Sequence, residues 1–186
     1  MIEREVKLRF DTPGEARAAV LASGATPLRP RRLQRDTLFD SDDQALARAR
    51  SAVRIRQDGT ASVLTFKGPV QSGPMKVREE IETAAADGDA LRRIFDRLGL
   101  RPWFRYEKYR EEFAARGVIV AVDETPVGTF VEIEGDADGI TAMAAALGKG
   151  PADYILDSYF RLFEKTREAL GFKGRDMIFD DPGRAQ

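Results

Sequence analysis

Charged and apolar side chains alternate along Ile2-Glu3-Arg4-Glu5-Val6-Lys7-Leu8-Arg9-Phe10. On a β-strand, successive side chains point to opposite faces of the sheet. One face of this segment is therefore mainly apolar, and the other holds Glu3, Glu5, Lys7 and Arg9. Taken alone, the pattern is typical of a strand with one face in the core and the other in water.

The same alternation recurs in six further segments, and like charges repeat two residues apart on several of the charged faces. These faces carry Arg54, Arg56, Lys67, Lys76, Arg78, Glu80, Glu82, Lys108, Arg110, Glu112, Asp123, Glu132 and Glu134. Neighbouring like charges repel, so the stability of a sheet gives no reason for them. Clustered carboxylates suit hard divalent cations, and clustered Arg and Lys suit phosphate oxygens. A polyphosphate with its metal ions needs both kinds of cluster, and the pattern predicts a site for such a ligand.

The order of the segments indicates the fold class. Strands are expected at about 2–10, 32–40, 52–57, 61–68, 75–83, 104–114, 117–124 and 129–135. Helices are expected between an N-cap at Thr12 and Gly24, and at about 89–98, 140–147 and 158–170. Many strands are spaced as hairpins, which favours an antiparallel α+β domain. A closed sheet would place the charged faces inside and the apolar faces outside under the helices. Because buried unpaired charge is costly, such an interior must be wet or filled by a ligand.

The length and composition limit the number of domains and the kinds of metal site and catalysis that the chain can have. The chain has 186 residues, which suits one domain, here expected at 1–170 with a C-terminal tail at 171–186. It has no Cys and no His, so thiolate and imidazole metal sites and Ser-His catalysis are excluded. Any metal must have oxygen ligands, which favours Mg²⁺ or Mn²⁺. In the tail, Met177, Ile178 and Phe179 are expected to dock, and residues 180–183 to fray.

Charge and hydropathy bear on partners and location. The net charge of −1 gives no basic field for nucleic-acid binding, and the basic cluster at 29–32 is expected to be a solvated face. No apolar run approaches the roughly 20 residues of a membrane span. The charged N-terminal segment 1–5 lacks the apolar stretch that is typical of a signal peptide. A cytoplasmic location fits these features. The sequence leaves the oligomeric state open, a homodimer included.

Ordered motifs along the chain resemble the CYTH superfamily, also called the triphosphate tunnel metalloenzymes. They are Glu3-Arg4-Glu5-Val6-Lys7, Val53-Arg54-Ile55-Arg56, Thr65-Phe66-Lys67-Gly68-Pro69, Arg78-Glu79-Glu80-Ile81-Glu82, Lys108-Tyr109-Arg110, Val122-Asp123, Gly128-Thr129-Phe130-Val131-Glu132-Ile133-Glu134 and Ser158-Tyr159. The first motif is weak alone, but the order of the set is specific, and it covers about residues 1–170. The resemblance implies an eight-stranded antiparallel tunnel that depends on Mg²⁺ or Mn²⁺.

The resemblance also implies roles by position. The metal-handling carboxylates would be Glu3, Glu5, Asp123, Glu132 and Glu134. The triphosphate clamp would be Lys7, Arg54, Arg56, Lys67, Arg78, Lys108 and Arg110. Glu80 and Glu82 are similar to tunnel acids whose role varies in the family. One hypothesis places a first ion at Glu3, Glu5 and Glu134, and a second near Asp123 and Glu132, where it would orient a water. Lys7, Glu5 and Glu132 are the candidate catalytic residues, and either Lys7 or a glutamate would assist proton removal.

Three reactions or roles remain open at this point. Hydrolysis of inorganic triphosphate, or of an organic one such as thiamine triphosphate, is the first, because three phosphates are what the motifs would hold. A class IV adenylate cyclase, which converts ATP to cyclic AMP and pyrophosphate, is the second. A module that binds polyphosphate or nucleotide without turnover is the third. Trp103, Phe104 and Tyr106 could stack on a base, but aromatic clusters are more often core.

Overall fold

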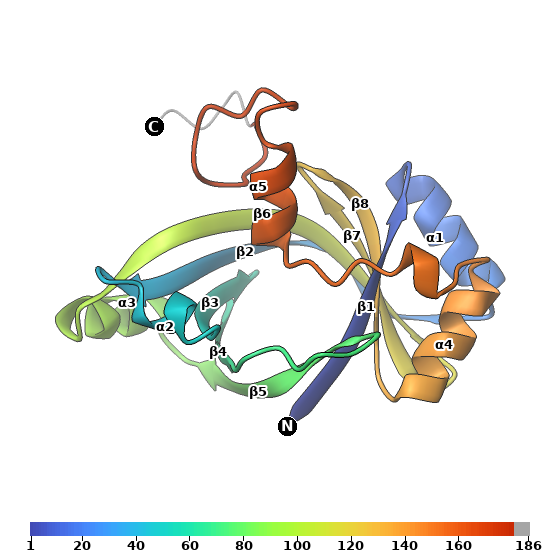
Figure 1. The fold of residues 1–186 in the computed structure, drawn as a ribbon, viewed down its shortest axis with the longest axis horizontal. Coiled ribbons are helices and arrows are strands. Elements are labelled where there is room, and N and C mark those ends of the chain that lie inside the picture. The colour runs from blue at the N-terminus through green and yellow to red at the C-terminus, as the bar shows by residue number, and fades with distance from the viewer. Residues whose placement is uncertain (181–186) are drawn as a thin grey trace.

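Within residues 1–180, which the computed structural model describes, eight antiparallel strands close into a barrel (Figure 1). Their order around the barrel is β1-β5-β4-β3-β2-β6-β7-β8. The strands are β1 Ile2–Phe10, β2 Thr26–Ser41, β3 Ala52–Asp58, β4 Ala61–Lys67, β5 Lys76–Ala85, β6 Leu100–Ala115, β7 Val118–Thr125 and β8 Gly128–Glu134. The expected antiparallel α+β barrel is confirmed.

Helices flank the barrel (Figure 1). They are α1 Pro13–Ala22, α2 Ala45–Arg48, α3 Gly88–Arg97, α4 Ala137–Ala146 and α5 Tyr159–Thr166, with a 3₁₀ turn at Pro151–Asp153. The expected N-cap at Thr12 is present, and its hydroxyl accepts a hydrogen bond from the Glu15 amide. Two expectations were wrong in detail. The short helix α2 was not foreseen, and α5 ends at Thr166 rather than near residue 170.

The strands β2 and β6 are much longer than expected. The prolines at 27 and 30 made the segment before residue 32 look unlike a strand, since proline donates no hydrogen bond. The β2–β6 pairing nevertheless starts at Thr26 and accommodates the prolines at register shifts between Pro27 and Arg29 and between Arg29 and Arg32. Bulges are where a strand tolerates proline. The extension brings Arg29 to the barrel wall, next to Arg32.

The helices cover the apolar outer faces of the barrel strands unevenly. One core packs β1, β7 and β8 under α1 and α4, and it includes Val6, Leu8 and Ile133, which are 0–1% exposed. A second lies between α5 and β6 and includes Phe104 and Phe163. A third, around Phe39 and Phe95, lies under α3. The expectation that helices cover all apolar faces was too broad, because Ile81 on β5 is 55% exposed.

The tail packs against the outside of β6. The Met177 side chain is fully buried, and its backbone pairs with Arg105 and Glu107. The Phe179 ring lies 5.3 Å from that of Tyr109. Docking of Met177 and Phe179 is therefore observed, whereas Ile178 is 39% exposed. Of the stretch expected to fray, 181–183 lies outside the described residues.

None of the helices within residues 1–180 combines the length and apolar character that a bilayer crossing requires.

Candidate active site

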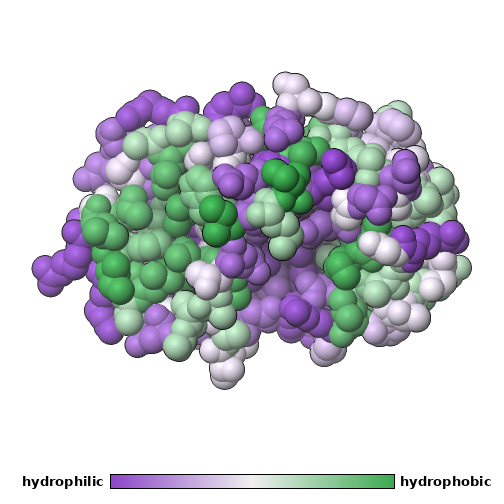
Figure 2. All heavy atoms as spheres, turned by 90° about the horizontal axis from the view of Figure 1, so that it is seen from below, coloured by the Kyte–Doolittle hydropathy of each residue, from purple (hydrophilic) through white to green (hydrophobic). Residues whose placement is uncertain are grey.

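A cavity of about 680 Å³ runs through the barrel. Figure 2 shows it as a hydrophilic hollow between two more apolar halves of the surface. Ten basic and eight acidic side chains line it, although the whole chain has a net charge of −1. All residues of the predicted clamp line the cavity, as do Glu80, Glu82 and the predicted metal carboxylates other than Asp123. The charged faces of the alternating strands therefore all point into one cavity.

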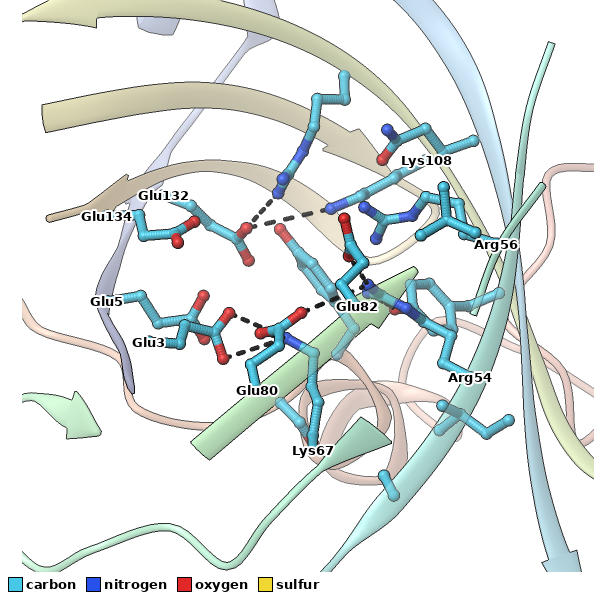
Figure 3. A pocket seen from close by; sticks show the side chains of 18 of the residues that line it. Glu3, Glu5, Arg54, Arg56, Lys67, Glu80, Glu82, Lys108, Glu132 and Glu134 are labelled. Carbon is cyan, nitrogen blue, oxygen red and sulfur yellow. Dashed lines mark hydrogen bonds and ion pairs between the residues drawn. The ribbon is translucent and has the colours of Figure 1, made fainter. Parts of the chain in front are cut away.

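One side of the cavity carries Arg54, Arg56 and Lys108 (Figure 3). Arg110, which shares the partner Asp123 with Lys108, belongs with them, and we call these four residues the basic wall. Asp36 on β2 lies behind its two arginines, with no side-chain exposure. The Arg56 Nε donates to Asp36 Oδ1 at 2.9 Å, and the Arg54 Nε lies 3.3 Å from the same oxygen. Burial alone would raise the pKa of Asp36, but Arg56 and then Arg54 outweigh it and hold that pKa below its usual value. Asp36 is therefore a fixed counter-charge for both guanidinium groups.

Asp123 has the same relation to the other half of the basic wall. Its carboxylate is fully buried and accepts from Lys108 at 2.8 Å, from Arg110 at 2.7 and 2.6 Å, and from the Tyr159 hydroxyl at 2.6 Å. Burial, followed by repulsion from Arg110, lowers the pKa of Lys108 to about 8. Asp123 does not line the cavity, and its oxygens are occupied by these donors. In this arrangement it positions the clamp.

Lys7 and Glu132 connect the basic wall with the carboxylates opposite. The two face each other across β1 and β8, and Lys7 Nζ lies 2.7 Å from Glu132 Oε1. Arg110 also donates to Glu132. Burial alone would lower the pKa of Lys7, but Glu132 and Glu5 raise it. Lys7 is therefore a buried cation that lines the cavity.

Across the cavity lie Glu3, Glu5, Glu80 and Glu134, which we call the acidic wall (Figure 3). Three of them already have cationic partners. Lys67 donates to Glu3 at 2.9 Å and to Glu80 at 2.6 Å, and Lys76 donates to Glu5 at 2.6 Å. Because ammonium groups hold these carboxylates, no three acidic side chains within residues 1–180 form a ready-made metal site.

Glu134 is the exception in the acidic wall. It is the register partner of Glu5 across β1 and β8, so two carboxylates face each other on neighbouring strands. In the part of the chain that the structure describes, its side chain makes no hydrogen bond or ion pair. Partial burial, followed by Glu3, Glu5 and Glu80, raises the pKa of Glu134 to about 7. This carboxyl is the place in the cavity where a further cation would be most favourable.

Several lining residues were missed from the sequence. They are Arg32, Gln34 and Asp58, which lie at one end of the cavity. Lys76, Glu112 and Tyr159 also line the cavity; the sequence placed the first two on charged faces and Tyr159 in a motif, but gave none of them a role in the site. Asp36, which is buried behind the cavity wall, was also given no role. The signal was present for β2, since Arg32, Gln34 and Asp36 alternate along it. The expectation that the cluster at 29–32 is solvated was wrong for Arg32, which pairs with Asp58 and Glu112 at 2.8 and 2.9 Å. Of the three aromatic candidates, Trp103 and Tyr106 line the cavity, and Phe104 is core.

Comparison with known proteins gives the family. The CYTH domain pattern matches residues 1–170. A protein of Methanocaldococcus jannaschii named "Putative adenylate cyclase" is 29% identical over 135 residues, which are 72% of this chain and 77% of that protein. The X-ray structure of a "putative adenylate cyclase" from Vibrio parahaemolyticus has a TM-score of 0.78 at 16% identity and covers 88% of this chain and 98% of its own. A Hippeastrum protein, whose structure is described with "a dominant triphophatase activity", has a TM-score of 0.63 at 20% identity, over 88% and 95% of the two chains. The chain belongs to the CYTH domain family.

Proposed function

We propose that this chain hydrolyses a triphosphate with the help of Mg²⁺ or Mn²⁺. The observation that carries the proposal is the division of one cavity into a basic wall and an acidic wall that face each other (Figure 3). A triphosphate brings several negative charges and the affinity for metal ions that such a division matches. Phosphoryl transfer depends mainly on positioning and charge neutralisation, which is what these walls offer.

The basic wall binds the phosphate chain. Arg54 and Arg56 are fixed from behind by Asp36, and Arg54 also donates to Thr65 at 3.0 Å, so binding a phosphate costs these side chains little further entropy. Lys108 and Arg110 are fixed in the same way by Asp123. Lys7 adds a positive charge between the walls. Together these groups stabilise the charge that develops on the leaving phosphate.

The acidic wall has the donor set that Mg²⁺ or Mn²⁺ prefers. Glu5 and Glu134 oppose each other in register, and Glu3 lies one side-chain position further along the same face of β1. We propose these three residues as the ligands. When bound, such an ion neutralises phosphate oxygens and polarises the phosphoryl group. Lys76 and Lys67, which hold Glu5 and Glu3, would then turn to other acceptors, Lys67 toward the phosphates.

Adenylate cyclisation is the second candidate. One observation favours it, because Leu38, Trp103 and Phe160 form an apolar section of the cavity wall, as a nucleoside would require. The relatives bear on both candidates. The Methanocaldococcus jannaschii protein is named "Putative adenylate cyclase", and the Hippeastrum protein, called a "Putative adenylyl cyclase", is described with "a dominant triphophatase activity".

A substrate panel tests the proposal. The purified chain would be given inorganic triphosphate, thiamine triphosphate and ATP, each with Mg²⁺ and with Mn²⁺. Orthophosphate and cyclic AMP would be measured separately. We expect orthophosphate to be released only with a divalent ion. Cyclic AMP with pyrophosphate would favour the cyclase, and saturable binding without any product would refute catalysis.

A further inference from the structure

Tyr159, the first residue of α5, places an aromatic ring among the charged groups of the cavity. Its side chain lines the cavity, although the residue is only 6% exposed. The Lys7 Nζ lies 4.6 Å from the centre of this ring, and the Lys108 Nζ lies 5.1 Å from it. The hydroxyl donates to Asp123 Oδ2 at 2.6 Å. One side chain therefore contacts two lysines of the cavity and the carboxylate that holds one of them.

The ring of Tyr159 is held in place from several sides. Phe130 on β8 meets it edge to face, with centroids 5.7 Å apart and planes at 67°. Contacts of this kind fix the orientation of a ring. The helix that carries it is capped by Ser158, whose hydroxyl accepts from the Arg161 amide, and is anchored by the fully buried Phe163. The position of the ring is thus defined before a ligand binds.

The two lysines come from strands that do not pair with each other. Lys7 is on β1 and Lys108 is on β6, and β7 and β8 lie between these strands in the barrel. The pairing of β1 with β5 ends at Glu5, and beyond it the segment that leads to α5 takes over. The Ile155 amide donates to the Lys7 carbonyl at 2.8 Å, and the Lys7 amide donates to the Ile155 carbonyl at 3.3 Å. Residues 155–159 therefore hold both the backbone and the side chain of Lys7.

A ring between two lysines acts differently from a carboxylate. Glu132 also contacts both, with oxygens 2.7 Å from Lys7 Nζ and 4.0 Å from Lys108 Nζ. A carboxylate neutralises an ammonium group and repels a phosphate. The face of an aromatic ring attracts an ammonium group through its π-electrons but has no net charge. The ring therefore lets two like charges lie close together and leaves their charge available to an anionic ligand.

We propose that Tyr159 is a positioning residue that sets the spacing of Lys7 and Lys108, and thereby the arrangement of the phosphates that these lysines contact. This inference rests on the proposed function and deepens it. The ring is the part that acts on the lysines, and the hydroxyl secures the ring to Asp123. Tyr159 acts through the lysines, without a contact of its own to the ligand.

Binding of inorganic triphosphate tests the role of the ring without turnover. The ligand would be titrated by calorimetry in the presence of EDTA. Tyr159→Leu should raise the dissociation constant about tenfold, because two cation–π contacts are lost. Tyr159→Phe keeps the ring and should raise it less than about threefold. Tyr109→Leu is the matched control, because the Tyr109 ring lies 3.7 Å from the Arg31 guanidinium but does not line the cavity.

The control should bind the ligand as the unmodified chain does, within about twofold. Equal losses in Tyr159→Phe and Tyr159→Leu would show that the ring is not the active part, and the inference would be wrong. A loss in Tyr109→Leu as large as that in Tyr159→Leu would also overturn it.

A double-mutant cycle separates positioning from a general packing defect. In a chain that carries Lys108→Met, only one of the two contacts of the ring remains. The cost of Tyr159→Leu should then fall from about tenfold to about threefold, because residues in contact are not additive. A packing defect would cost the same factor in both backgrounds, and that result would contradict the inference.

The free protein gives a readout that needs no ligand. Lysine labelled with ¹³C would be followed by NMR, and the ε-methylene signals of Lys7 and Lys108 would be assigned from their Met variants. An aromatic ring displaces the signals of groups that lie over it. Tyr159→Leu should therefore move both signals and leave that of Lys149, which lies over the Phe10 ring, in place. If both move but no triphosphate is bound or hydrolysed, the proposed function fails and the positioning role stands. If neither moves, the inference is wrong, whatever the chain hydrolyses.

Discussion

The basic wall and the acidic wall face each other across one cavity, but their charges are balanced differently. Each cation of the basic wall has a carboxylate behind it, Asp36 for Arg54 and Arg56, and Asp123 for Lys108 and Arg110. Both of these carboxylates are fully buried. In the acidic wall, Glu5 and Glu134 oppose each other, and the Glu134 carboxyl has no hydrogen-bond or ion-pair partner among residues 1–180.

This difference shows which part of the site folding completes and which part it leaves open. The basic wall is neutralised from behind, so it is rigid and its charges are stable before any ligand binds. The acidic wall retains a repulsion that only an added cation or a proton can relieve. We infer that the phosphate site is preformed and that the ion site is completed by its ion. The predictions below separate these two properties.

The largest effect is expected where the basic wall loses its support. Asp36→Asn removes a fully buried carboxylate, so that Arg56 loses this ion pair and Arg54 keeps only the longer contacts to Glu80 and Glu82 at 4.0 and 3.8 Å. Breaking a buried ion pair by removing one partner costs about 3–5 kcal/mol of unfolding free energy. Urea unfolding of the two proteins would measure it. Asp43→Asn is a matched control, because Asp43 pairs with Arg48 at an exposed site and should show no comparable loss.

Asp36 should also make the free energy of unfolding depend on pH. The pKa of Asp36 in the folded chain lies below that of an unfolded aspartate, so the unfolded state binds the proton more tightly. The stabilisation is therefore complete above the unfolded pKa of about 3.9 and is lost as the pH falls through the folded pKa. Asp36→Asn should flatten this acid limb of the stability profile. An unchanged acid limb would show that Asp36 is not the counter-charge.

A smaller effect, on rate rather than on folding, is expected within the walls. Arg56→Ala leaves Asp36 paired with Arg54, so the chain should fold. It removes a donor to the developing phosphate charge, and loss of one such donor costs about 10²–10³-fold in turnover. Glu5→Gln should have an effect of similar size by weakening the ion site. Arg92→Ala, which only breaks an exposed helical pair with Asp89, is the control. Near-normal rates in both wall variants would contradict the assignment.

The comparison of the walls also explains what the sequence could predict. Glu3, Glu5, Arg54 and Arg56 were placed in the cavity correctly, because alternation along a strand is a local property that the chain itself displays. The closed barrel followed from the number of such faces. The limits of β2 did not follow, because the bulges that accommodate its prolines depend on pairing with β6.

The counter-charges were harder to predict for a physical reason. Asp36 lies on an alternating segment but has no like-charged neighbour two residues away, so it lacked the signal that marked the other acids. Asp123 was predicted to be a metal-handling carboxylate, and in the structure its carboxylate accepts hydrogen bonds from Lys108 and Arg110. The sequence could not distinguish a metal ligand from an ion-pair partner. That distinction depends on which donors converge in three dimensions, and Tyr159 comes from a helix 36 positions away in the chain.

The smallest effect concerns stability at the acidic wall, and its sign is opposite to that of Asp36→Asn. Glu134→Gln removes one of two like charges that face each other, and a cross-strand pair contributes roughly 0.2–1 kcal/mol, so the metal-free chain should become more stable by that amount. The raised pKa of Glu134, about 7, means that the folded state binds its proton more tightly than the unfolded state does. The cost of the carboxylate therefore grows as the pH rises from about 4.3 to 7, and the gain in the variant should grow over the same range. Calorimetric binding of Mn²⁺ should weaken in the same variant. If the variant is less stable without metal, or binds Mn²⁺ as before, the acidic wall does not retain a charge repulsion that an added cation relieves, and the contrast with the basic wall is wrong.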